Sequence, residues 1–473
     1  MADFTGTSGD DIITGTEDSD FIDVSQGGND TVNAEGGDDV VYIGAALNKG
    51  DHIDGGDGFD TLQLDGNYSR LTLNANLVAN IESVTLAAGH DYHIKIANTV
   101  VAANGSLTID ASALGAGDGA TLDATGVKRG TLTLTGGAGD DTLIGGQKGH
   151  ALDILNGGAG NDTIYSDGTN FNNFHTIGGP HTIDGGDGND TIYAANGDTV
   201  TGGDGNDTIN FANYFLGHSG SIASVDAGAG DDNVIFFIAE IGPGQLQGGA
   251  GTDTLEVDST LNLNMQSFSA ASSGFEIIAM QGLYIGDQED NTFDFSGFTP
   301  ASTSGELTVS GGIGDDTLTG TSGSDWFHGG DDNDVLSTGS GNDFLFGENG
   351  NDTLIGGSGQ DVLTGGAGSD TFVFASLDDS PTGPHHRDEI TDFTHSDGDL
   401  IDLSAIDADT TQDGNQAFHL GGNTFTDTPG ELIQFIDRQG LTIVQGDVNG
   451  DGIADFAIRI DGGITLTADD FVL

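Results

Sequence analysis

Residues 311–373 read GGIGDDTLT, GTSGSDWFH, GGDDNDVLS, TGSGNDFLF, GENGNDTLI, GGSGQDVLT and GGAGSDTFV, which are seven nonamers in tandem. They share the template G-G-x-G-x-D-x-U-x, where U is apolar. A glycine-rich hexamer favours a turn, because glycine adopts positive φ at little cost and weakens helix and strand interiors. The remaining x-U-x is a short strand whose U side chain points inward. Two nonamers therefore close one coil of 18 residues.

The same nonamer recurs upstream in four clusters. Its aspartate position is occupied there by Asp11, Asp20, Asp30, Asp39, Asp60, Asp141, Asp162, Asp190, Asp207, Asp232 and Asp253. In the tandem run it is occupied by Asp316, Asp325, Asp334, Asp343, Asp352, Asp361 and Asp370. The residue two positions after each of these eighteen aspartates is apolar. Because the blocks were aligned on Gly and Asp alone, this agreement indicates a real structural repeat and argues against a disordered acidic chain.

The charge of the chain limits its partners. Its 473 residues include 76 Asp and Glu but only 9 Lys and Arg, which gives a net charge of −67. Such a chain is not expected to bind nucleic acid or an anionic membrane surface. Folding also requires positive charge that the side chains do not supply, so we expect inorganic cations. The absence of Cys excludes disulfides and thiolate metal sites.

The repeats resemble the RTX, or hemolysin-type, calcium-binding proteins. The resemblance implies that backbone carbonyls of the turn and its Asp hold Ca²⁺ between successive coils. Oxygen ligands suit Ca²⁺, and the seven tandem repeats would then hold about five ions. It implies metal ligands at the eighteen aspartates and at the glycines that open five tandem repeats: Gly311, Gly329, Gly347, Gly356 and Gly365.

The last hundred residues resemble the C-terminal module of serralysin-type proteases and alginate epimerase R-modules. The matching text is DEITDF, GDLIDLSAID, GDVNGDGIADFAIRI and ADDFVL. The resemblance implies a β-sandwich-like cap and an uncleaved signal for type I secretion, in keeping with an N-terminus that lacks a basic and apolar leader. Within it, Asp447, Asn449, Asp451 and Asp455 follow EF-hand spacing, although Ile458 replaces the bidentate Glu. The alternative is a simple hairpin turn.

These observations predict an all-β chain: a parallel β-roll or β-solenoid of calcium-binding nonapeptide repeats with a C-terminal cap. The two stretches that interrupt the repeats match each other, for example TLTLTGGAGDDTL (131–143) and ELTVSGGIGDDTL (306–318), so we infer a duplicated insert. The expected divisions are a repeat roll (1–63), a calcium-free solenoid insert (64–135), an interrupted roll (136–256), the second insert (257–310), the seven-repeat roll (311–374) and the secretion module (375–473).

The expected function is that of a secreted protein that folds on multiple Ca²⁺ ions outside the cell. We expect a structural, surface-layer, adhesive or biofilm-matrix role, with calcium, the type I secretion apparatus, and a second copy or a cell-surface polysaccharide as partners. No membrane insertion is expected, because no apolar run is long enough to span a bilayer. The sequence indicates no catalytic residue. A polysaccharide lyase or epimerase that uses the inserts is the alternative, by analogy of fold alone.

The irregular text in 166–226 includes NFNNFHTIGGPHT (170–182), which predicts either a binding loop or an ordinary insertion.

Overall fold

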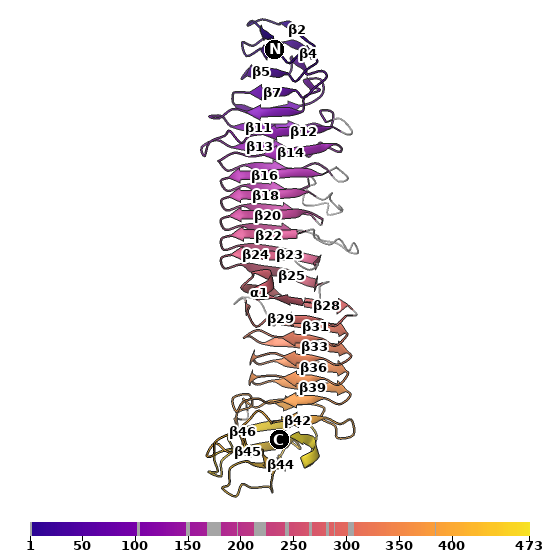
Figure 1. Ribbon diagram of the computed structural model, residues 1–473, viewed down its shortest axis with the longest axis vertical. Coiled ribbons are helices and arrows are strands. Elements are labelled where there is room, and N and C mark those ends of the chain that lie inside the picture. The colour runs from indigo at the N-terminus through magenta and orange to yellow at the C-terminus, as the bar shows by residue number, and fades with distance from the viewer. Residues whose placement is uncertain are drawn as a thin grey trace. The chain divides into compact units, whose positions relative to one another are not determined.

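The computed structural model describes residues 2–101, 105–147, 152–167, 181–195, 197–211, 224–241, 246–263, 267–280, 283–287, 289–300, 307–383 and 385–473. The chain divides into two compact units. The first comprises residues 1–240 and 244–254, and the second comprises residues 241–243 and 255–473. Both are built from short strands stacked in parallel sheets (Figure 1). The described residues contain no helix long and apolar enough to cross a membrane.

The first unit has one long parallel sheet, in which each strand pairs with the strand one coil further on. Its strands are β1 (Asp3–Thr5), β3 (Phe21–Asp23), β5 (Val40–Gly44), β7 (Thr61–Leu64), β10 (Ser83–Leu86), β12 (Ser106–Asp110), β14 (Thr131–Thr135), β16 (Asp153–Ala159), β18 (Thr182–Asp187), β20 (Thr199–Asp204), β22 (Ser224–Ala229) and β24 (Leu246–Ala250).

Two further parallel ladders complete the coils of the first unit. The shorter is β2 (Ile12–Thr16), β4 (Thr31–Glu35), β6 (His52–Asp54) and β9 (Val78–Ala79). The longer is β8 (Tyr68–Leu73), β11 (Tyr92–Ile96), β13 (Ala120–Asp123), β15 (Thr142–Ile144), β17 (Thr163–Tyr165), β19 (Thr191–Ala194), β21 (Thr208–Phe211) and β23 (Asn233–Ile241). Strands of the stretch 64–135 thus pair directly with strands of the flanking repeats.

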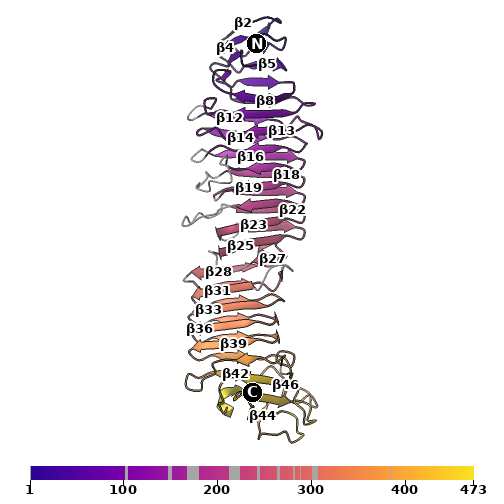
Figure 2. The ribbon, with the colours of Figure 1, turned by 180° about the vertical axis from the view of Figure 1, so that it is seen from behind.

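The second unit also has two parallel ladders, and Figure 2 shows several strands of the first ladder from behind. One is β25 (Thr254–Leu263), β28 (Leu283–Asp287), β31 (Leu307–Ile313), β33 (Asp325–Asp331), β36 (Phe344–Asn349), β39 (Val362–Ala367) and β41 (Glu389–Ile390). The other is β26 (Ser267–Ser269), β29 (Thr292–Asp294), β32 (Thr317–Thr319), β34 (Val335–Ser337), β37 (Thr353–Ile355), β40 (Thr371–Val373), β42 (Leu400–Asp402) and β47 (Phe471–Val472).

Smaller elements complete this unit. They are β27 (Ile277–Met280) paired with β30 (Thr299–Pro300), β35 (Ser340–Gly341) paired with β38 (Ser358–Gly359), α1 (Ala270–Ser273) and the 3₁₀ helix η1 (Ala468–Asp470). The C-terminal strands are β43 (His419–Leu420), β44 (Glu431–Ile436), β45 (Thr442–Asp447) and β46 (Phe456–Ile460). Strands β44, β45 and β46 form an antiparallel meander, and β46 joins the roll through β41.

The register confirms the predicted parallel roll with a coil of 18 residues. Phe327 pairs with Leu345, and Leu345 pairs with Leu363, so each apolar U position lies beside the U position one coil further on. Of the eighteen U side chains, seventeen have no exposed surface, and only Ile13 in the first coil is half-buried. The core of each coil is therefore this inward-facing apolar column.

On one side of the tandem roll, the strands are longer than the three residues that the sequence predicted. β32, β34, β37 and β40 have three residues, but β33 continues through Gly329 and Gly330 to Asp331. Gly330 pairs with Gly312 of the preceding coil and has a φ of +127°. A Cβ at Gly330 would clash with the carbonyl oxygen of Gly312, so only glycine permits the two backbones to pair this closely. Glycine is generally unfavourable inside a strand, which is why the sequence predicted a turn here.

Candidate functional site

The repeat aspartates form ladders that run from coil to coil. In the tandem roll, the backbone N–H of Asp316 donates to Oδ1 of Asp334 at 2.9 Å, Asp334 donates likewise to Asp352 at 2.8 Å, and Asp352 to Asp370 at 2.9 Å. A second ladder runs through Asp325, Asp343 and Asp361 with distances of 2.8 and 2.9 Å. The fold thus brings together aspartates that lie 18 residues apart.

The first unit repeats this arrangement. One ladder links Asp11 to Asp30 and another links Asp20 to Asp39 and Asp60, with distances of 2.7 to 2.9 Å. A longer one, with the same range of distances, runs through Asp141, Asp162, Asp190, Asp207, Asp232 and Asp253. Every repeat aspartate except Asp11 is at most 2% exposed. The predicted ligands are therefore a buried column of carboxylates.

The second carboxylate oxygen is what remains available for a metal. Among the described residues, Oδ2 is buried and has no hydrogen-bond partner in several repeat aspartates, namely Asp39, Asp60, Asp162, Asp190, Asp207, Asp232, Asp334, Asp352 and Asp361. A buried oxygen of a charged group without a partner is costly. Its recurrence at the same position of coil after coil indicates a place where a positively charged partner fits.

In the tandem repeats that open with glycine, this glycine lies beside Oδ2 of the repeat aspartate. A Cβ added at Gly347 would clash with Oδ2 of Asp352 and would lie 2.5 Å from the carbonyl oxygen of Gly365. At Gly329 it would clash with Oδ2 of Asp334 and lie 2.8 Å from the carbonyl of Gly347. Gly311, Gly356 and Gly365 have Oδ2 of Asp316, Asp361 and Asp370 in the same place. The turn is thus a cradle of carboxylate and carbonyl oxygens that a side chain would fill.

These residues fit Ca²⁺ by the chemistry of their donors. Every donor in the cradle is a carboxylate or carbonyl oxygen, which is the ligand class that Ca²⁺ accepts, and no nitrogen or sulfur group takes part. No group of three or more Asp, Glu, His or Cys side chains converges for metal binding within the described part of the chain. The carboxylates are spread along the ladder, so backbone carbonyls would have to complete each site.

Burial also shifts the acidity of the ladder. Desolvation raises the pKa of Asp334 to about 8, with a hydrogen bond from the Asp316 backbone opposing it. The same cause raises the pKa of Asp162, Asp207, Asp325 and Asp361 to about 7. Without a cation, ionised carboxylates in this column are therefore disfavoured.

The acidic loop near the C-terminus connects β45 to β46 as a hairpin. Asp447 is fully buried, and its two oxygens accept the backbone N–H groups of Gly450 at 2.7 Å and Gly452 at 2.8 Å. Asp455 accepts from the Asn449 side chain at 3.0 Å, and Asp451 accepts from the Ile453 backbone at 2.9 Å. Metal binding by this loop stays a prediction.

Sequence reasoning missed several residues that extend the ladders. The N–H of Asp30 donates to Asp51 at 2.8 Å, Asp361 donates to Asp388 at 2.9 Å, and Asp370 donates to Asp399 at 3.1 Å. Desolvation, to which repulsion by the charge of Asp361 adds, raises the pKa of Asp388 to about 9. Each lies two residues before a buried apolar residue, in D-x-U text without the G-G-x-G pattern, and that signal could have identified them.

The predicted binding loop NFNNFHTIGGPHT (170–182) lies almost entirely outside the described residues.

Comparison with known proteins identifies the repeat. The family model of the RTX calcium-binding nonapeptide repeat (four copies) matches residues 24–45, 133–147, 152–170, 182–198, 198–212, 310–345, 338–372 and 346–380. No curated protein matches the chain.

Two solved structures, both from Azotobacter vinelandii, are similar to part of it. The AlgE6R2 subunit of mannuronan C5-epimerase has 29% identity over 33% of this chain and 91% of its own, with a TM-score of 0.25. The AlgE6R3 subunit has 30% identity over 36% of this chain and 82% of its own, with a TM-score of 0.22. The matched ranges lie in both of its units, so the chain carries RTX calcium-binding nonapeptide repeats in each of them.

Proposed function

We propose that this chain is a secreted structural or adhesive protein whose β-roll forms only when Ca²⁺ occupies its turns. The observation that carries this proposal is the buried aspartate ladder, with its repeated oxygens that have no hydrogen-bond partner. A net charge of −67 opposes compaction, and cations between the coils would offset it at the place where the carboxylates are closest together.

Calcium availability would then decide where the chain folds. Extracellular calcium modules have dissociation constants of about 10⁻⁴–10⁻³ M, so their sites fill outside the cell and stay empty in a low-calcium cytosol. Because binding is restricted to the folded state, its free energy adds to the stability of the fold. The resemblance of 311–473 to exported modules supports type I secretion of an unfolded chain.

Calcium titration of the purified chain tests the first step. After dialysis against EGTA, we expect far-UV circular dichroism to show an unfolded chain, and a cooperative gain of β signal as Ca²⁺ reaches the millimolar range. Mg²⁺ at the same concentration should give little change, since it requires a smaller octahedral site. Full β content in EGTA at modest ionic strength would contradict the proposal.

The surface role and export need separate measurements. Sedimentation of the calcium-loaded chain should reveal self-association, or pull-down with intact cells should reveal binding to a surface polysaccharide. A strict monomer that binds neither would contradict an adhesive or layer-forming role. Expression of the full chain with and without a type I export apparatus, followed by assay of the medium, tests secretion. Limited proteolysis in calcium tests the proposed divisions at 63, 135, 256, 310 and 374.

A further inference from the structure

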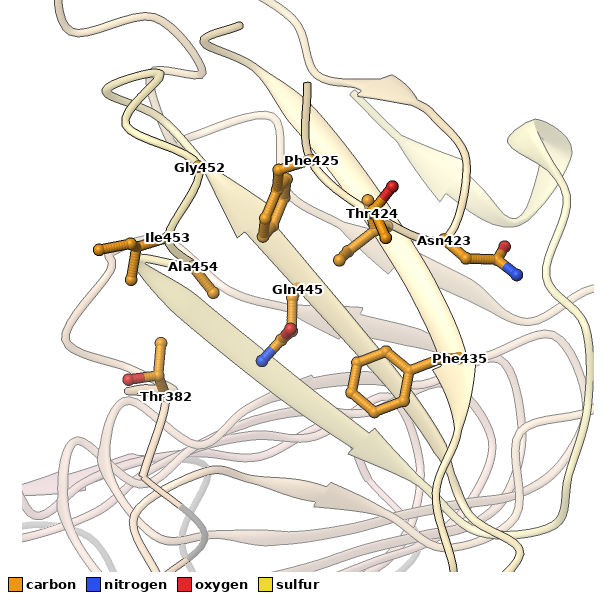
Figure 3. Close-up of a pocket in the computed structure, with 10 residues that line it drawn as sticks. Thr382, Asn423, Thr424, Phe425, Phe435, Gln445, Gly452, Ile453 and Ala454 are labelled. Atoms are coloured by element: carbon orange, nitrogen blue, oxygen red, sulfur yellow. The ribbon is translucent and has the colours of Figure 1, made fainter. Parts of the chain in front are cut away.

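The C-terminal meander carries an open hollow of about 580 Å³. It lies between the hairpin of β44 and β45, the loop that contains Asn423, Thr424 and Phe425, the turn at Gly452 to Ala454, and Thr382 (Figure 3). This volume suits a small ligand of one or two rings. The hollow lies in the cap, apart from the repeat aspartates described above.

The hairpin places both apolar and polar groups in the hollow. Ile433 on β44 pairs with Gln445 on β45, and Phe435 follows two residues after Ile433, so it projects from the same face of the strand. Ile433 is 5% exposed, whereas Phe435 is 38% exposed. Figure 3 shows the Phe425 ring above the Gln445 side chain and the Phe435 ring to its right. A large apolar ring is therefore left open to solvent beside an amide.

The polar side chains of the hollow are not engaged by other described residues of the protein. Those of Thr382, Asn423, Thr424 and Gln445 make no hydrogen bond with any described residue. Gln434, on the same hairpin but outside the hollow, differs: its amide donates to the Leu466 carbonyl at 2.7 Å and accepts from the Leu466 N–H at 2.8 Å. The hollow thus concentrates donors and acceptors that are available to a ligand.

The lining carries no charge in a chain whose net charge is −67. The surrounding negative potential disfavours an anionic ligand, and no carboxylate in the lining attracts a cation. A purely apolar ligand would bury Gln445 and Thr424 without hydrogen bonds, which is costly. A ligand with one apolar face and many hydroxyl groups satisfies both sets of residues.

We propose that this hollow binds a sugar ring of a neutral saccharide. The apolar face of the ring would stack on Phe435, and its hydroxyl groups would exchange hydrogen bonds with the amide of Gln445 and with Thr424. This inference gives the proposed adhesive role a class of ligand. It rests on the proposed function in one respect, namely that the cap must be folded for the hollow to exist.

Isothermal titration calorimetry of the full chain in calcium tests the proposal. The probes are cellohexaose, maltohexaose, chitohexaose and a galactan oligomer, with an oligoguluronate as the anionic comparison. At least one neutral probe should bind with a dissociation constant in the range of about 1 mM or below, and the oligoguluronate should not bind at the hollow. Circular dichroism of the same sample shows separately whether the chain has folded.

Three variants locate the binding. Phe435→Ala and Gln445→Leu should each weaken binding about tenfold, through loss of the ring contact and of the amide. Ile436→Ala, at the neighbouring residue that is 53% exposed and does not line the hollow, should stay within about twofold.

Failure has recognisable forms. With the chain shown to be folded, no binding of any neutral probe up to about 10 mM would overturn the proposal. Binding that both pocket variants leave unchanged would also overturn it, as would concentration-dependent dimerisation that Phe435→Ala abolishes, because the hollow would then hold a second copy. A chain that does not fold in calcium would instead contradict the proposed function.

Discussion

The backbone N–H of Asp334 donates to Oδ1 of Asp352 at 2.8 Å, while Oδ2 of Asp352 is buried without a hydrogen-bond partner among the described residues. At Asp352, and at the other repeat aspartates whose Oδ2 has no partner among the described residues, one oxygen thus holds the coils in register and the other is available to a cation. The same side chain therefore has opposite effects on stability: it stabilises the roll when calcium is bound and destabilises it when calcium is absent.

Asp352→Asn should separate these two effects. Asparagine keeps the acceptor for Asp334 but replaces the second oxygen with an amide, so we expect a loss of about 1–3 kcal/mol in calcium. In EGTA, a low temperature or an osmolyte can keep part of the chain folded. Under these conditions the variant should be at least as stable as the parent, because it lacks one buried charge. Urea unfolding in both conditions measures this.

Asp413→Asn is the matched control, because Asp413 is exposed and lies outside the repeats. This variant should change the free energy of unfolding by no more than about 0.5 kcal/mol, either in calcium or in EGTA. A loss for Asp352→Asn that is equal with and without calcium would show that Asp352 acts through packing alone.

The pH dependence of the roll should reverse with calcium. Burial raises the pKa of Asp334 to about 8 and that of Asp361 to about 7, above their value in the unfolded chain. The calcium-free fold then binds more protons than the unfolded chain, so its stability is greatest below about pH 4 and falls as the pH rises through about 7 to 8. In calcium the carboxylates must be ionised, so calcium affinity should fall on acidification.

Circular dichroism at pH 5, 6, 7 and 8 checks the pH dependence of stability in EGTA and the pH dependence of calcium affinity in a Ca²⁺ titration. The β signal in EGTA should increase toward pH 5, and the calcium midpoint should move to higher concentration over the same range. A midpoint that does not depend on pH would contradict ligation by these carboxylates.

The repeat template predicted the core because the apolar U residues and the positive-φ turns occur at a fixed period. The template hid Asp51, Asp388 and Asp399, because the G-G-x-G pattern is absent before them. At Asp51 and Asp399, a local backbone N–H group donates to Oδ2. Oδ2 of Asp51 accepts from the Asn48 backbone at 2.7 Å, and Oδ2 of Asp399 accepts from Thr394 at 2.7 Å. The hollow was not predictable, since Thr382, Phe425 and Gln445 meet only through long-range pairing.

Gly359→Ala should strongly destabilise the tandem roll. Gly359 has a φ of +152°, which an L side chain rarely adopts, and a Cβ there would clash with the carbonyl oxygen of Gly341 in the preceding coil. We expect a loss of about 2–4 kcal/mol in calcium and a higher calcium midpoint.

Gly117→Ala is the control for this substitution, because a Cβ at Gly117 meets no atom within 4 Å. It should stay within about 0.5 kcal/mol of the parent in the same urea titration. Equal effects of the two substitutions would argue against the close approach of backbones at Gly359.

Trp326 should report folding of the tandem roll. It is the only tryptophan of the chain, it is half-buried on β33, and its ring stacks on Phe344 of the next coil with centroids 4.2 Å apart. Because that contact requires two adjacent coils, calcium should shift the tryptophan emission to shorter wavelength at the same midpoint as the β signal. Emission that changes at a different calcium concentration would show that this roll folds separately from the rest.

His395 should stabilise the C-terminal segment in a pH-dependent way. Nδ1 lies 2.5 Å from Oδ1 of Asp470 and Nε2 lies 3.1 Å from the carbonyl oxygen of Thr465, so both ring nitrogens face acceptors and the arrangement requires the imidazolium form. The hydrogen bond with Asp470 raises the pKa of His395 above 6.5. Its contribution is therefore fully present below about pH 6.5 and is lost as the pH rises through the higher folded value.

In calcium, His395→Gln should cost about 0.5–1 kcal/mol at pH 6, a small value because the imidazole is partly exposed, and close to nothing at pH 9. His93→Gln, at an exposed histidine in the first unit, should show no such difference. Since calcium affinity itself changes with pH, the comparison is between variant and parent at each pH under saturating calcium. A loss for His395→Gln that is the same at both pH values would mean that the ring contributes by packing, and that the pairing of its charge with Asp470 does not hold the segment to the roll.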